Sequence, residues 1–207
     1  VATLKKHPIY PLRAADTFNS DPLAVLLNAF SKIEREGGGA ALQIIIKSAP
    51  QKYLGTYQDI IKRIRGGMKV SESIARSSMS GEFYASFKDL LVGGKKKPEL
   101  TVQAPDIDQD ALEVFAHKIA SPMLEVNLRI AVSATSALRT AQIREEIEAV
   151  FNQFEDPRAN RIAFRQVAGK ALATAIRHFS FREFVGSETL PLSMRELATL
   201  MHFPGNG

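Results

Sequence analysis

The sequence predicts an α+β fold whose two halves repeat one order of elements. Segments with apolar residues at every third or fourth position alternate with segments in which apolar residues occur at every second position, and these are the periods of helices and strands. Residues 21–49 and 108–134 share the order helix, break, strand and further helix, and both strands end in Ser-Ala. The second half also closes as strand, helix, strand, which is half of a ferredoxin-like unit.

The first half begins with a helix that starts at Asp21-Pro22, because Asp caps a helix and Pro suits its first position. Apolar residues at helical spacing predict its buried stripe: Leu23, Leu26, Leu27, Phe30 and Ile33. A strand follows over residues 40–48, with Leu42, Ile44 and Ile46 on one face and Gln43, Ile45 and Lys47 on the other. Helices are expected next over 51–65, 70–77 and 81–91.

The second half contains the clearest strand of the chain, over residues 123–133. Its inward residues by alternation are Leu124, Val126, Leu128, Ile130 and Val132. Helices are predicted over 107–120, 136–155 and 170–178, a strand over 161–167, and a last helix that begins with a capping box, Ser193 to Glu196. We expect the 123–133 strand to lie antiparallel to the 161–167 strand, or one strand away from it.

The boundary between the halves is predicted in a segment rich in glycine, lysine and proline. Residues 93–106 contain Gly-Gly, three consecutive lysines and two prolines, which is a composition typical of linkers. The predicted organisation is therefore a first α+β half over 1–92, a linker over 93–106 and a second α+β half over 107–207.

Composition limits the classes of protein to which the chain can belong. The chain has 207 residues and a net charge of +5. Residues 1–100 hold 16 Lys/Arg against 9 Asp/Glu, and residues 101–207 hold 11 against 13, so the basic excess lies in the first half. The absence of cysteine excludes disulfides and thiolate metal sites and fits a cytoplasmic protein. No apolar run approaches the roughly 18 residues of a membrane span.

No motif of catalysis or cofactor binding is complete. The run Asp106-x-Asp108-x-Asp110 resembles the start of a calcium loop, but the positions that need Gly and Glu hold Ala111 and His117. The histidines have no ligand spacing, and no glycine run matches a phosphate-binding loop. We therefore expect no catalytic residue, no cofactor and no metal, and the chain is not predicted to be an enzyme.

The polar faces of the predicted strands indicate a candidate partner-binding surface. Helices that cover one side of an antiparallel sheet leave the other side to water or to a partner. That side presents Gln43, Lys47, Asn127, Arg129 and Arg165, with Ile45 among them. Amides and cations without aromatic residues favour a polar protein interface over base stacking. The alternative is that helices cover both faces, in which case Ile45 belongs to the core.

Six stretches together resemble the region before the motor domain in bacterial conjugative DNA-transfer ATPases of type IV secretion, which are FtsK/HerA-like. They are FNSDPLAVLLNAFSKI (18–33), AALQIIIK (40–47), SPMLEVNLRIAVSA (121–134), AVFNQF (149–154), FSFREF (179–184) and ELATLMHFP (196–204). The resemblance implies a P-loop motor beyond residue 207 and membrane segments upstream, outside this chain. None of the motor's nucleotide-binding residues can be assigned here.

The expected function is thus a non-catalytic accessory domain that positions such a motor on the secretion machinery, at the inner face of the membrane or on a neighbouring subunit. The expected partners are the motor, secretion components or a second copy, and any membrane association is expected through segments outside this chain. The alternative is a DNA-binding module that uses the basic first half.

Overall fold

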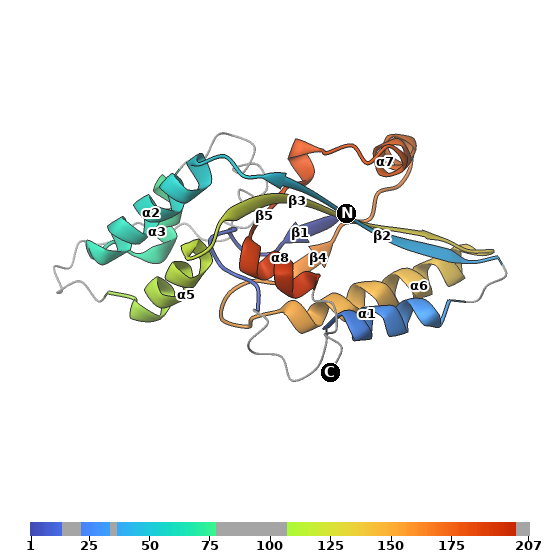
Figure 1. Cartoon of the computed structure of the whole chain (residues 1–207), viewed down its shortest axis with the longest axis horizontal. Helices are drawn as coiled ribbons and strands as arrows, with labels where there is room; N and C mark the ends of the chain where they lie inside the picture. The colour runs from blue at the N-terminus through green and yellow to red at the C-terminus, as the bar shows by residue number, and fades with distance from the viewer. Residues whose placement is uncertain (14–21, 34–36, 78–106, 202–207) are drawn as a thin grey trace, which may run out of the picture. The chain divides into compact units, whose positions relative to one another are not determined.

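The computed structural model describes residues 1–13, 22–33, 37–77 and 107–201, and it is an α+β fold of helices and small antiparallel sheets (Figure 1). The chain divides into two compact units, one formed by Val1–Ala49 with Ser121–Gly207 and the other by Pro50–Ala120. This division differs from the predicted halves, because residues 1–49 join the second half of the chain. The predicted linker over 93–106 and the predicted helix over 81–91 lie outside the described residues.

The pairing of two long strands explains this division. β2 (Gly39–Ser48) runs antiparallel to β3 (Met123–Ser133) in a register that joins Gly39 to Ser133 and Ser48 to Leu124. The strand of the first predicted half is therefore hydrogen-bonded to the strand of the second. The second unit, Pro50–Ala120, is inserted between β2 and β3 in the sequence.

Two short strands that the sequence analysis did not predict complete the sheets. β5 (Leu190–Ser193) pairs with the start of β3, which gives the order β2-β3-β5. β1 (Ala2–Leu4) pairs with β4 (Ile162–Phe164) in a separate two-stranded sheet. The sequence predicted that β3 lies antiparallel to the 161–167 strand or one strand away from it, and β4 instead pairs with β1 in a sheet that does not contain β3.

Three helices of the first unit, α1 (Pro22–Ser31), α6 (Ala137–Val150) and α8 (Met194–Leu200), cover the apolar face of the longer sheet. α1 packs beside α6, and α8 lies near them (Figure 1). β1–α1–β2 and β3–α6–β4 are two strand–helix–strand units whose strands pair as β1–β4 and β2–β3. This is the connectivity of a ferredoxin-like unit. The predicted strand–helix–strand order of the second half is confirmed.

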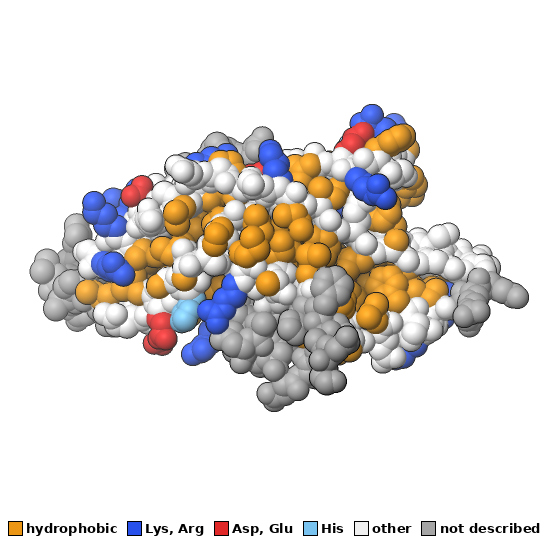
Figure 2. Space-filling model, viewed as in Figure 1, with side chains coloured by type: hydrophobic (Ala, Val, Ile, Leu, Met, Phe, Trp, Pro, Cys, Tyr) orange, Lys and Arg blue, Asp and Glu red, His pale blue; other side chains and the backbone are white. Residues whose placement is uncertain are grey.

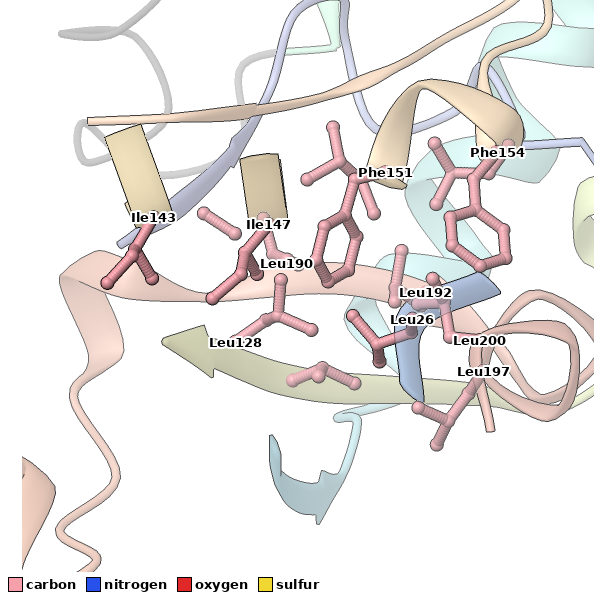
Figure 3. Packing of buried hydrophobic residues seen from close by; sticks show 14 residues of the cluster. Leu26, Leu128, Ile143, Ile147, Phe151, Phe154, Leu190, Leu192, Leu197 and Leu200 are labelled. Atoms are coloured by element: carbon pink, nitrogen blue, oxygen red, sulfur yellow. The ribbon is translucent and has the colours of Figure 1, made fainter. Parts of the chain in front are cut away.

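The core of the first unit lies between these helices and the sheets (Figure 3). Val126 and Leu128 point inward from β3, as the alternation predicts. Ile143 and Ile147 of α6 pack against them, and the short 3-10 helix η2 (Phe151–Phe154) adds two aromatic rings. The predicted stripe of α1 is wrong at Leu27, which is 56% exposed.

The start of α8 is fixed by the predicted capping box. The Ser193 side chain accepts from the Glu196 N–H, and Glu196 Oε2 accepts from the Ser193 N–H at 2.6 Å. The other carboxylate oxygen of Glu196 accepts from the Leu12 N–H at 2.7 Å, so one buried side chain joins the N-terminal segment to the last helix.

The second unit contains α2 (Lys52–Arg65), α3 (Val70–Arg76) and α5 (Gln109–Ile119). The core of this unit includes Tyr53, Tyr57, Ile60, Ile61 and Ile64 of α2 and Phe115 of α5. Asp108 caps α5, because its side chain accepts from the Ala111 N–H at 2.9 Å. The capping contact gives Asp108 a structural role at a helix start, where negative charge is favourable.

Candidate docking surface

The polar face of the sheet brings four of the five predicted surface residues together. In the register of β2 and β3, Gln43 lies opposite Arg129 and Lys47 lies opposite Glu125. Asn127 lies between them on β3, on the same face by alternation. Arg165, the fifth, lies just beyond β4, and its backbone is paired with Val1.

This face is covered at its centre. Asn127 is fully buried and Arg129 is 4% exposed. The cover is the chain from the end of α7 (Lys170–Ser180) through the short helix η3 (Gly186–Glu188), which passes over the sheet on the side opposite α1 and α6 (Figure 1). The prediction of an open face is therefore wrong for Asn127 and Arg129, because a segment about fifty residues away in the sequence lies on top of them.

Arg129 is the centre of a buried hydrogen-bond network. Its Nε donates to Glu188 Oε2 at 2.8 Å, and its Nη1 donates to Gln43 Oε1 at 3.1 Å and to the His178 carbonyl at 3.3 Å. Its Nη2 donates to Asn127 Oδ1 at 3.1 Å. All three guanidinium nitrogens therefore have partners, which a buried charge requires for stability.

The amides of the network hold the covering segment by its backbone. Asn127 Nδ2 donates to the Val185 carbonyl at 3.0 Å, and Asn127 Oδ1 accepts from the Val185 N–H at 2.7 Å. Gln43 Nε2 donates to the Phe179 carbonyl at 2.8 Å, in the last turn of α7. We call Gln43, Asn127, Arg129 and Glu188 the polar anchor. Its contacts fix the end of α7 and the following turn to the sheet.

The helix held by the polar anchor exposes its apolar side. None of the α7 side chains is buried, and the exposed fractions of Leu172 and Ile176 are 44% and 56%. These two residues share one helix face, because they are four positions apart. Phe181, just after the helix, is 73% exposed. Where Figure 1 places α7, Figure 2 shows hydrophobic side chains on the surface with Lys and Arg side chains beside them.

Comparison with known protein families gives a match for the chain. A domain family described as "Domain of unknown function (DUF8128)" matches residues 1–206. The chain belongs to the DUF8128 family. No curated protein and no solved structure matches the chain.

The remaining predicted residues of this DUF8128 domain lie at the border of the covered face. Lys47 is exposed, lies 3.7 Å from Glu125 Oε2 and has its ammonium 5.4 Å from the centre of the Phe184 ring. Arg165 is exposed. Ile45 is half-buried on the same face as the polar anchor, so it supports neither a fully open nor a fully covered sheet.

Sequence reasoning missed Glu188, Leu172 and Ile176. Glu188 gives no local signal, because its partner Arg129 is distant in the sequence. The spacing of Leu172 and Ile176 was a readable signal of an amphipathic helix, although spacing alone does not distinguish an exposed apolar face from a buried one.

In the described ranges, no cluster of His, Asp and Glu could hold a metal ion, and no helix has the length and apolar character to cross a bilayer.

Proposed function

We propose that this DUF8128 domain is a docking module that positions the motor of a conjugative DNA-transfer ATPase against the secretion machinery, the inner membrane face or a neighbouring subunit. The observation that carries the docking role is α7, whose apolar side is exposed while its last turn is fixed to the sheet by the polar anchor. Exposed apolar residues on an ordered element are typical of an interaction site. The assignment to a conjugative ATPase rests on the sequence resemblance.

The polar anchor supports this proposal because it makes the docking element rigid. A surface helix with no buried side chain has little packing to hold it, and an isolated helix of this length is marginal in water. Hydrogen bonds from Gln43 and Arg129 to the carbonyls of the last turn compensate for this, and the Arg129 charge is favourable at a helix C-terminus. A pre-ordered element loses less conformational entropy when it binds.

The assignment to an ATPase is tested by the gene that encodes the chain. We expect a glycine-rich phosphate-binding loop in the reading frame after residue 207 and ATP hydrolysis by the full-length protein. The 207-residue chain alone is expected to show no ATP-dependent rise in melting temperature. A stop codon directly after residue 207 would remove the motor and with it this proposal.

The second candidate function is DNA binding, which a group of cations at the end of α2 favours. Lys62, Arg63 and Arg65 lie in the last turn of this helix. Phosphate contacts by such residues make binding strongly dependent on salt. Binding of duplex or single-stranded DNA that falls steeply with salt and is lost in Lys62→Glu/Arg65→Glu supports this candidate over docking.

A further inference from the structure

The chain around α7 is basic over a long stretch. Residues 157–182 contain six Lys/Arg and no Asp or Glu. Within α7, Lys170 and Arg177 lie on the side of the helix opposite Leu172, by the angle of 100° per residue. Glu183 follows the stretch and lies 3.4 Å from Arg177. Lys170 and Arg182 take part in none of the ion pairs among the described residues, so their charges are available to an anionic partner.

The end of α7 holds an arginine in a backbone conformation that usually belongs to glycine. The Glu183 N–H donates to the His178 carbonyl and the Arg182 N–H donates to the Phe179 carbonyl, which is the Schellman pattern. The residue in the left-handed position is Arg182, with φ 53°, and it is the sole described non-glycine residue with a positive φ. A side chain in this conformation is strained. This strain makes Arg182 a position at which to test whether the side chain has a function.

We propose that α7 and its terminal turn lie on the surface of an anionic phospholipid bilayer. Leu172 and Ile176 enter the boundary between headgroups and acyl chains, and Phe181 adds an aromatic side chain at the end of the helix. Lys170, Arg177 and Arg182, on the polar side and at the end of the helix, add electrostatic attraction to the anionic headgroups. This combination of an apolar side and cations is typical of interfacial helices. The proposal rests on the proposed docking function and names its partner, and it places membrane contact within this chain rather than only outside it.

A lipid surface fits these residues better than a second copy of the chain. An isologous contact through α7 would gather the cations around α7 of both copies at one interface, and like charges repel. A stable protein interface also buries about 800 Å² on each partner, which Leu172, Ile176 and Phe181 cannot supply alone. An anionic bilayer attracts the cations of α7 and its terminal turn and accepts a small apolar area.

The test is co-sedimentation of the 207-residue chain with vesicles. Vesicles of equimolar phosphatidylglycerol and phosphatidylcholine are expected to bind the chain, and vesicles of phosphatidylcholine alone are not. Binding should weaken when salt is raised from about 0.1 M to about 1 M, since the screening length falls from about 10 Å to about 3 Å. Leu172→Ser/Ile176→Ser should abolish binding, while the control Leu138→Ser, at a residue 71% exposed on α6, should not change it.

Arg182→Gly separates a lipid contact from a structural role. Glycine relieves the backbone strain, so the variant should melt at a higher temperature while it binds anionic vesicles about fivefold more weakly. The lipid proposal is overturned if the wild-type chain ignores anionic vesicles, or if the serine variant binds them as the wild type does. A concentration-dependent dimer that the serine variant loses, without vesicle binding, would assign α7 to a second copy. In each of these cases a motor found after residue 207 leaves the proposed docking function standing.

Discussion

Arg129 on β3 and Glu188 at the end of η3 form a buried ion pair, with 2.8 Å between Nε and Oε2 and with side chains only 5% and 11% exposed. The pair joins the centre of the sheet to the segment that carries α7. Charges removed from water need such partners, and the loss of one partner leaves the other charge uncompensated. The polar anchor is therefore a structural element first, and its effect on docking is indirect.

Charge reversal should destabilise the fold at Arg129 and leave its stability nearly unchanged at Arg165. Arg129→Glu places a second carboxylate beside Glu188 in a buried site, so we expect a loss of at least about 3 kcal/mol in the free energy of unfolding. Arg165→Glu alters an exposed side chain, and we expect a change within about 0.5 kcal/mol. Urea unfolding of both variants measures the difference. Equal stability of the two variants would contradict the buried network.

Asn127→Ala should release the covering segment locally. The substitution removes both hydrogen bonds to the Val185 backbone and leaves that backbone N–H without its partner, at an expected cost of about 1 to 3 kcal/mol. Amide hydrogen exchange at Val185 should accelerate more than exchange at Leu128, which follows Asn127 on β3 and lies in the core. An unchanged exchange rate at Val185 would show that the segment is held by other contacts.

Arg182→Gly should stabilise the fold. A left-handed backbone costs a residue with a side chain about 1 kcal/mol relative to glycine, so the free energy of unfolding should rise by about this amount. Arg182→Ala is the matched control, since it removes the charge and keeps the strain. If both variants unfold at the same denaturant concentration, the strain at this position has no energetic weight.

Glu148 should make stability depend on pH. Partial burial raises the pKa of its carboxyl above the ordinary value of 4.5, although the Arg144 guanidinium and the Val1 amino group oppose this shift. The native state then holds the proton more tightly than the unfolded state, so stability falls as pH rises from the ordinary value through the raised one. Glu148→Gln should flatten this part of the stability curve. An identical pH profile in the variant would contradict the assignment.

The sequence predicted which apolar residues are buried better than it predicted which polar residues are buried. Strand alternation identified Val126 and Leu128 as core, because a period of two is a local property of the chain. The burial of Asn127 and Arg129 depends on a distant segment, and local pattern carries no information about it. β5 was missed because it is short and contains Pro191, which argues against a strand. An asparagine in the middle of a long strand was a usable signal, since such positions disfavour it unless it has partners.

The measurement that tests the docking claim most directly is DNA transfer by the full-length protein, the proposed conjugative ATPase, carrying Leu172→Ser/Ile176→Ser. We predict that transfer falls to the level of a strain without the protein, while the amount of protein and its basal ATP hydrolysis stay as in the wild type. Leu138→Ser, which also removes an exposed leucine, should transfer normally. Normal transfer by the double serine variant would contradict the account, because α7 would then have no docking role.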